Sequence, residues 1–407
     1  MQQLYFAMNQ AITHKWLPFF LAASALTIPI SSTAKSICLV LSVLFIVFNP
    51  SFHQDLRKTL SQPWCKAALL LFAMAAIACL WSPATMHERT LVLEKYSKLL
   101  YLPVLAVGFR DSNSRHYAIR GFIVAMAITC ILSFVKALGY LSYNDISPDM
   151  IDPGTVFRNH IMTGYMMAFA AFLAGLLAYQ SKGRSRLLYS VLFFAFSIQV
   201  LLINTGRTGY VIYLLLMGIL AIHLFSWRQA LMAALLGCVM IAGIVIQHEG
   251  VQTRLKEVAQ EWNQYHHTSH KDTSIGYRLQ FQAYANTLFL QHPIIGAGTG
   301  SFTYSFGRDK PVPSWDRRLL EPHNIYWLVA VEFGVVGLVL LGAFFSSLIW
   351  AALHLNTTRP IAFAVIIPFL VGNLTDSLLF YSGTGFLFIL FMALCLGEQF
   401  QTPSLKR

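Results

Sequence analysis

The sequence predicts an all-α polytopic membrane protein, with about 12 transmembrane helices and one long polar loop. Two observations carry this prediction. Hydrophobic residues make up 56% of the 407-residue chain, and charged residues make up only 11%. Soluble domains carry roughly 25% charged residues, so this chain has less than half of the charge needed to face water. A membrane protein is therefore the class that fits the composition.

The apolar runs along the chain place the predicted helices. A spanning helix needs roughly 20 mostly apolar residues, and about 12 runs approach this length, although the second and fourth are short. The runs cover residues 16–34, 36–49, 66–82, 99–109, 117–140, 161–180, 187–204, 209–226, 229–246, 334–355, 360–376 and 383–399. Residues 247–322 form one large polar loop between the ninth and tenth runs. Because no soluble domain or repeat interrupts the pattern, we interpret residues 1–407 as a single integral membrane domain.

The basic residues predict how the chain is oriented. Cytoplasmic loops of membrane proteins carry an excess of Lys and Arg. If both termini are cytoplasmic, the short loops on their side contain 14 Lys and Arg, against 7 in the short loops opposite. This bias predicts that the 247–322 loop faces outward, which in a bacterium is the periplasm. The formal net charge of +12 does not predict nucleic-acid binding, because the basic residues form no contiguous stripe.

Several common catalytic and metal-binding patterns are missing from the sequence. The six cysteines lie in or beside apolar runs without a CxxC pair, so neither a disulfide framework nor a cysteine metal site is predicted. The lack of GxSxG, Walker and DxD motifs argues against a serine hydrolase, an NTP-driven pump and metal-bound nucleotide sugars. The histidines of "HHTSH" (266–270) lack an acidic or cysteine partner at metal-ligand spacing and are assigned to a solvated loop. We predict no cofactor and no metal site.

Four polar residues stand out on the outer side of this topology. Arg207 lies in "INTGRTGY", a tight turn between two apolar runs, where the positive-inside trend does not expect an arginine. Arg278 falls in the first turns of an amphipathic helix expected over residues 277–290 along the membrane surface. His323 closes the long loop, and Asp376 ends the eleventh helix. Two arginines, a histidine and a carboxylate on one membrane face suit a site for anionic chemistry.

Each of these residues also has a simpler explanation. Arg207 could bond lipid phosphate at the interface, Arg278 could be a solvated residue, and His323 could only anchor a helix end. The segment "PIIGAGTGS" is glycine-rich, but it follows a helix instead of a strand, so a dinucleotide site is not expected there. We interpret it as a tight return of the chain toward the membrane.

Three motifs together resemble a known family. In "HNIYWLVAVEFGVVG", His323, Asn324, Gly334 and Gly337 have the spacing of the O-antigen ligase family. This family shares a superfamily with O-antigen polymerases and protein O-oligosaccharyltransferases. "HPIIGAGTGSF" is similar to the glycine-rich segment of that superfamily, and "TGRTGY" to its outer-side arginine motif. The strongest resemblance covers residues 187–345, which form an O-antigen ligase-like core region.

The resemblance implies a C-type glycosyltransferase architecture in the bacterial inner membrane, with both termini cytoplasmic and a periplasmic active site. Such a ligase transfers O-antigen glycan from undecaprenyl diphosphate to a sugar hydroxyl of lipid A–core, which completes lipopolysaccharide. Transfer is expected to be metal-independent and to invert the anomeric centre. The partners implied are the lipid-linked glycan, the lipid A–core acceptor and membrane lipid.

By position, Arg207 and Arg278 match arginines that contact the diphosphate, and His323 matches the catalytic histidine. Asp376 matches the acid of the last outer loop. The candidate catalytic residues are His323, Arg207 and Arg278, and the candidate substrate-binding residues are Asn324, Asp376, Arg158, His160, Arg317 and Arg318.

These residue types fit the implied chemistry. Arginine stays cationic and bonds phosphate with two nitrogens, and a histidine that is substantially neutral at pH 7 can accept a hydroxyl proton. A polymerase or a protein-glycosylating relative with the same donor chemistry remains an alternative. An alternative from another class is a secondary transporter, which places charges near the membrane midplane in broken helices. The apolar runs are nearly free of charge, which argues against transport.

Overall fold

The computed structural model describes residues 2–140, 152–229, 232, 249–268 and 271–401. Within these ranges the chain forms helices and turns and contains no β-strand, which confirms the all-α prediction. The α-helices are α1 (Gln2–Ile30), α2 (Ser32–Phe48), α3 (His53–Ser61), α4 (Pro63–Ile77), α5 (Met86–Tyr96), α6 (Lys98–Gly108), α7 (Ser112–Ala137), α9 (His160–Gln180), α10 (Gly183–Ile198), α11 (Arg207–Leu224), α13 (Glu249–His267), α14 (Ser274–Gln291), α15 (Ser301–Asp309), α16 (Ile325–Leu353), α17 (Arg359–Gly372) and α18 (Ser382–Leu396). Short helical turns are η1 (Pro50–Phe52), η2 (Ala78–Leu80), η3 (Gln199–Ile203) and η4 (Gly397–Phe400).

Seven helical segments in the described part of the chain are long and apolar enough to cross a membrane. They are Pro63–Leu80, Ser112–Ala137, His160–Gln180, Gly183–Ile203, Arg207–Leu224, Ile325–Leu353 and Ser382–Phe400. The pair Ser32–Phe48 and Pro50–Ser61, bent by 81°, makes an eighth candidate. A polytopic membrane protein is thereby confirmed, whereas the count of 12 stays a prediction. The predicted run at 229–246 lies almost wholly outside the described residues.

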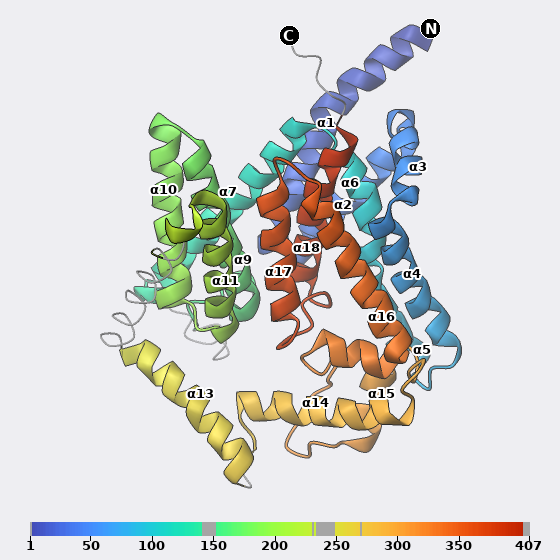
Figure 1. Ribbon diagram of the computed structural model, residues 1–407, viewed down its shortest axis with the longest axis vertical. Helices are drawn as coiled ribbons and strands as arrows, with labels where there is room; N and C mark the ends of the chain where they lie inside the picture. The colour runs from blue at the N-terminus through green and yellow to red at the C-terminus, as the bar shows by residue number, and fades with distance from the viewer. Residues whose placement is uncertain (1, 141–151, 230–231, 233–248, 269–270, 402–407) are drawn as a thin grey trace.

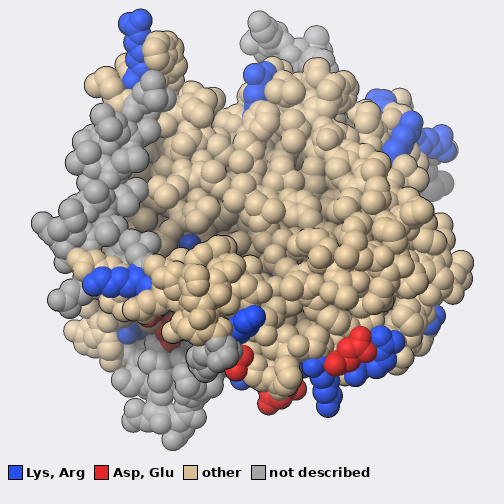
Figure 2. Space-filling view, turned by 60° about the horizontal axis from the view of Figure 1, so that its bottom comes forward, with Lys and Arg blue, Asp and Glu red and all other residues tan. Residues whose placement is uncertain are grey.

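The bundle positions the long loop at one end of the molecule. Helices α16, α17 and α18 lie between α9–α11 on one side and α2–α6 on the other (Figure 1). Helices α13, α14 and α15, all from the 247–322 loop, lie at the end opposite to the N-terminal end of α1 (Figure 1). On the face in Figure 2, charged side chains form small separate groups on a surface made mostly of other residues. The loop helices and the N-terminal end of α1 therefore lie at opposite ends of the molecule, and the orientation in the membrane stays a prediction.

Two helix boundaries differ from the sequence prediction near the end of the bundle that holds the loop. The tenth run was expected from residue 334, but α16 begins at Ile325, because the side chain of Asn324 caps it. Its Oδ1 accepts hydrogen bonds from the N–H groups of Tyr326 and Trp327. The eleventh run was expected to reach 376, but α17 ends at Gly372. Asp376 therefore lies in the turn between α17 and α18.

Helix α16 is broken at Gly334, whose backbone adopts φ 63° and ψ −158°. The break leaves backbone groups of residues 331–336 without partners in their own helix, and residues 293–298 supply those partners. Four backbone hydrogen bonds join the two segments, from Ala297 N–H to Val331 O, Gly298 N–H to Glu332 O, Val335 N–H to Pro293 O and Val336 N–H to Ile294 O. The glycine-rich segment thus returns toward the bundle, as the sequence predicts, and docks on the break.

Glycines allow the two backbones to approach this closely. A Cβ on Gly296 would lie 2.3 Å from the carbonyl carbon of Glu332, and a Cβ on Gly334 would lie 2.3 Å from Ile294 O. Gly296 and Gly334 also have positive φ, which side chains disfavour. Gly296 and Gly334, one from each glycine motif of the sequence, therefore both permit the close contact between residues 293–298 and the break in α16.

Glu332 and Lys98 are buried ionisable residues that lie just outside the expected apolar runs at 334–355 and 99–109. The side chain of Glu332 is completely buried within α16. One carboxylate oxygen accepts the N–H of Gly300, at the start of α15, at 2.8 Å. Lys98 is also buried, and it donates to the carbonyls of three residues between α17 and α18, namely Leu379, Phe380 and Tyr381. These buried charges bond to neighbouring segments of the bundle.

The crossing at Gly334 makes a testable prediction. Gly334→Ala adds a side chain at positive φ, which costs roughly 1–3 kcal/mol, and sets it against a backbone oxygen. We expect a clear loss of thermal stability in detergent, measured by fluorescence-detected size exclusion after heating. Gly342→Ala is the matched control, because nothing lies within 4 Å of its Cβ position in the same helix. Equal stability of both variants would show that the crossing does not hold the fold together.

Candidate functional site

His323 stands in a strained position directly before α16. Its φ is 53°, in the left-handed region that few residues other than glycine adopt. Two contacts hold the backbone there. The N–H of His323 donates to Glu321 Oε2 at 2.6 Å, and the next residue, Asn324, caps α16. In this conformation the imidazole contacts Asp376 in the turn between α17 and α18.

The α17–α18 turn is docked onto the start of α16 by hydrogen bonds. Asn324 Nδ2 donates to Leu374 O at 3.0 Å, and the N–H of Ile325 donates to Asn373 O at 3.1 Å. The buried side chain of Asn373 accepts the N–H of Leu378 at 2.9 Å and so shapes the turn itself. These contacts bring Asp376 to His323, 53 residues earlier in the chain.

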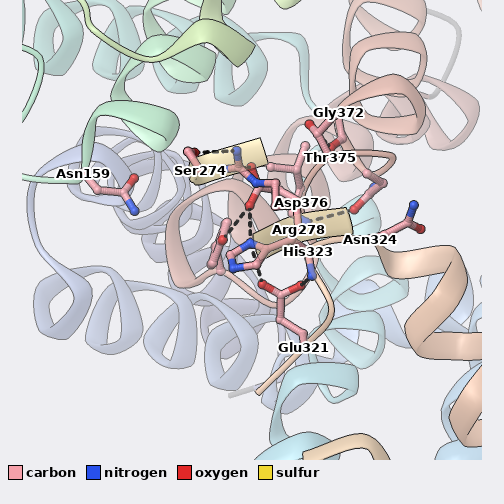
Figure 3. A network of polar contacts seen from close by, with 12 residues as sticks. Asn159, Ser274, Arg278, Glu321, His323, Asn324, Gly372, Thr375 and Asp376 are labelled. Carbon is pink, nitrogen blue, oxygen red and sulfur yellow. Dashed lines mark hydrogen bonds and ion pairs between the residues drawn. The ribbon is translucent and has the colours of Figure 1, made fainter. Parts of the chain in front are cut away.

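His323 and Asp376 form a hydrogen-bonded pair. Nδ1 of His323 lies 2.9 Å from Asp376 Oδ1 and 3.3 Å from Glu321 Oε1. Because two carboxylates face Nδ1, that nitrogen carries a proton, and in the neutral ring Nε2 then has the free lone pair. Tyr381 O–H also donates to Asp376 Oδ1, at 2.9 Å. Figure 3 shows Arg278, Glu321 and His323 gathered around Asp376.

The carboxylates change the proton affinity of His323. Burial alone would lower its pKa, but the hydrogen bond to Asp376 and the charges of Glu321 and Asp376 outweigh burial, so the pKa is raised above 6.5. Burial raises the pKa of Glu321, although the charge of His323 opposes this shift. The ring therefore holds its proton to a higher pH than an ordinary histidine.

Helix α14 covers this pair. The sequence predicts a helix at 277–290, and the structure extends it to Ser274–Gln291, capped by the side chain of Thr273. Arg278 Nη2 lies 3.8 Å from Asp376 Oδ2, the oxygen that His323 does not use. Phe281, one turn later, stacks on the imidazole with ring centroids 6.0 Å apart. The predicted diphosphate-binding arginine and the predicted base thus share one carboxylate.

Arg207 was expected in a turn before the run at 209–226, but it is the first residue of α11, and its bonds lead to another helix. Its Nη2 lies 2.6 Å from Glu261 Oε1 and 3.3 Å from Glu257 Oε2, both on α13. Glu261 also accepts the N–H of Ile275 in the first turn of α14, at 2.9 Å. Glu261 therefore connects Arg207 to α14, the helix that carries Arg278. This connection does not involve a direct bond to the His323–Asp376 pair.

The other predicted substrate-binding residues have separate contacts. Arg158 donates to the carbonyl of Ile28 at 2.9 Å and to the Ser32 hydroxyl, which ties the start of α9 to the α1–α2 junction. In Figure 3 its neighbour Asn159 lies apart from the cluster around Asp376.

His160 and the pair Arg317 and Arg318 lie in two further places. His160 Nδ1 lies 3.1 Å from Asp152 Oδ2. Arg318 lies 3.6 Å from Glu88, and Arg317 is exposed. These contacts do not join any of the three side chains to His323, and their substrate-binding role stays a prediction.

Sequence reasoning missed two residues of the cluster. Glu321 is in the segment "EPHN", and an acidic residue two positions before a candidate base was a signal that could have found it. Tyr381 offered no comparable signal, because it reaches Asp376 only through the shape of the α17–α18 turn.

Glu321, His323 and Asp376 have donor atoms within 4.8 Å of one another, so they are the residues in this site able to surround a metal ion. The Nδ1–Oδ1 distance of 2.9 Å is also that of a hydrogen bond. Metal independence stays a prediction. Of the "HHTSH" histidines, His266 and His267 end α13, and His270 lies outside the described residues.

Part of the chain matches the family that the sequence motifs resemble. The family model described as "O-Antigen ligase" matches residues 191–342. These bounds closely follow the core region expected at 187–345, and they include Arg207 and His323 but not Asp376. No curated protein matches the chain. Residues 191–342 are therefore similar to the O-antigen ligase domain.

Proposed function

We propose that this protein transfers O-antigen glycan from undecaprenyl diphosphate to a sugar hydroxyl of lipid A–core at the periplasmic face of the inner membrane. The observation that best supports this is the His323–Asp376 pair, with Arg278 on the second oxygen of the same carboxylate. A proton acceptor and a permanent cation lie together, as expected where a hydroxyl attacks and a phosphate leaves. The O-antigen ligase family model that matches residues 191–342 supports this kind of donor and acceptor.

The proposed reaction is a direct displacement. The acceptor oxygen attacks the anomeric carbon of the donor sugar and forms the new glycosidic bond. The bond between that carbon and the phosphate oxygen breaks, and its electron pair stays on the phosphate, so undecaprenyl diphosphate leaves. Attack from the face opposite to the leaving group inverts the anomeric centre.

His323 Nε2 takes the acceptor proton in this scheme. Asp376 holds Nδ1 protonated, so the free lone pair is on Nε2, and both neighbouring carboxylates stabilise the imidazolium that forms. A raised pKa makes the neutral ring a stronger base, although a smaller fraction of it is neutral at a given pH. General-base catalysis of this kind contributes typically 10²–10⁴-fold.

Arg278 and Arg207 stabilise the charge that develops on the diphosphate. A guanidinium remains cationic at physiological pH and can bond two phosphate oxygens at once. Phe281, which stacks on His323, keeps the base beside an apolar surface. This favours an ordered sugar hydroxyl over bulk water and so limits hydrolysis of the donor.

Ligase and polymerase functions can be separated by deleting the gene and separating lipopolysaccharide on a gel. For a ligase, we expect loss of the O-antigen ladder and accumulation of long glycan on the lipid carrier. Lipopolysaccharide that carries a single repeat would instead identify a polymerase. Transfer by the purified protein, with EDTA present, tests the expected metal independence, and strict dependence on added divalent ions would refute it.

His323→Ala should slow transfer by typically 10²–10⁴-fold, because it removes the proton acceptor and leaves both arginines in place. The assay uses purified protein, lipid-linked glycan and lipid A–core. His354→Ala is a matched control, since His354 follows the other end of α16 and its ring bonds a local carbonyl, Trp350 O. Normal rates in both variants would leave His323 as a helix-end residue and end the general-base proposal.

The pH profile tests the carboxylates around His323. The base must be neutral, and its pKa is raised, so the rate should climb as pH rises through a value above 6.5. Glu321→Gln removes one of the charges that raise this pKa, so the acid side of the rate profile should move to lower pH. Rates are normalised to their high-pH plateau to separate this shift from a change in maximal rate.

Asp309→Asn is the control for the pH experiment, because it removes a carboxylate that bonds Arg308 and Tyr284 instead of His323. Its profile should match the unmodified protein. A Glu321→Gln profile that stays in place, or moves to higher pH, would contradict the proposed environment of the base.

A further inference from the structure

The two arginines proposed to bind the donor are already paired with carboxylates. Arg207 contacts Glu257 and Glu261, and Arg278 lies near Asp376. A lipid-linked diphosphate brings two negative charges to this place. It can gain the full attraction of Arg207 only if a carboxylate gives up its contact with that guanidinium, since like charges side by side repel.

The two glutamates on α13 differ in how firmly they are held. Glu261 lies 2.6 Å from Arg207 and its side chain is 14% exposed, whereas Glu257 lies at 3.3 Å and is 49% exposed. Glu261 has a second bond, from the N–H of Ile275. Burial would raise the pKa of Glu261, but its bonds to Arg207 and Ile275 outweigh burial and lower it. Glu257 is therefore the carboxylate that separates from Arg207 more easily.

Glu261 also belongs to both halves of the proposed diphosphate site. It bonds Arg207 at the start of α11 and the first turn of α14, one turn before Arg278. The positive charge of Arg278 also acts on Glu261. Moving Glu261 would loosen the connection between the two arginines, which come from segments about 70 residues apart.

Arg207 retains one terminal nitrogen for a new partner. Its Nη1 atom is buried and has no hydrogen-bond partner among the residues that the structure describes. A buried donor without a partner costs free energy, which an incoming acceptor recovers. Nη2 holds the glutamates, so an anion that replaces Glu257 could engage both terminal nitrogens.

We infer that Glu261 is a positioning residue that holds Arg207 and Arg278 in one diphosphate site, and that Glu257 is the counter-ion that the donor diphosphate displaces from Arg207. This inference rests on the proposed function for the identity of the anion. Helix α13 thereby acts on the site through two glutamates one turn apart. Glu261 favours binding of the donor, and Glu257 competes with it.

The first experiment measures binding of undecaprenyl diphosphate to the full-length protein in nanodiscs. Glu257→Gln removes the competing charge, so affinity should rise by roughly 2–5-fold, the range expected for a partly exposed ion pair. In the transfer assay, KM for the lipid-linked donor should fall while kcat stays within about twofold. Unchanged or weaker binding would show that the diphosphate does not replace Glu257.

Glu261→Gln should do the reverse. Loss of the bridge should weaken donor binding and lower kcat by roughly tenfold or more, since a misplacement of about 1 Å can cost 10²-fold. Glu261→Asp, which keeps the charge, should recover part of the activity. A Glu261→Gln variant that binds donor more tightly with normal kcat would make Glu261 a second counter-ion and overturn its positioning role.

Two controls separate these effects from stability and from net charge. Thermal stability of each variant is measured in parallel, and Glu261→Asp supplies the comparison if Glu261→Gln does not fold. Asp272→Asn removes a negative charge from the loop between α13 and α14, where Asp272 bonds Ser314, and should leave donor affinity unchanged. An equal gain in affinity from Asp272→Asn would attribute the Glu257 effect to net charge alone and overturn the inference.

The proposed function and this inference can fail independently. A protein that binds undecaprenyl diphosphate more tightly after Glu257→Gln, yet transfers no glycan, would refute the proposed function and support displacement. A protein that transfers glycan normally, but whose affinity for the diphosphate does not respond to Glu257→Gln, would support the function and refute displacement.

Discussion

The arrangement of the site depends on the hydrogen bonds of one side chain, that of Asn324. Its Oδ1 caps α16 through the N–H groups of Tyr326 and Trp327, and its Nδ2 holds the carbonyl of Leu374 in the α17–α18 turn. One amide therefore sets where α16 begins and how the turn with Asp376 meets it. His323 directly precedes Asn324, so its ring is held beside Asp376, which lies 53 residues later in the chain.

The proposed function assigns two tasks to two groups of side chains. In this proposal, His323 with Asp376 and Glu321 accepts a proton, and these residues meet at the start of α16. Arg278 and Arg207 would bind the phosphate charge, and they are carried by α14 and α11. Asp376 lies between both groups, because its two oxygens face the histidine and the arginine separately. A change in the position of His323 or of Arg278 therefore affects the other residue through the carboxylate of Asp376.

Much of this site could be predicted from sequence because the relevant signals are local. Arg207 and His323 stand out against the charge pattern of a membrane topology, and both lie in recognisable motifs. The start of α16 was misplaced by nine residues, since a capping asparagine carries no hydropathy signal. Pairings such as Arg207 with Glu261 depend on how α13 packs, which no spacing along the chain encodes. The raised pKa of His323 likewise arises only after folding brings Asp376 near.

The break at Gly334 has a mechanical consequence for the histidine. An unbroken helix transmits tilt and bending along its whole length, through its own i to i−4 hydrogen bonds. At Gly334 that connection is replaced by bonds to residues 293–298, so α16 consists of two shorter segments whose junction is bonded to the glycine-rich segment. The direction of the segment that starts beside His323 is therefore set at this junction by residues 293–298, and not by the helical hydrogen bonds of the longer segment alone.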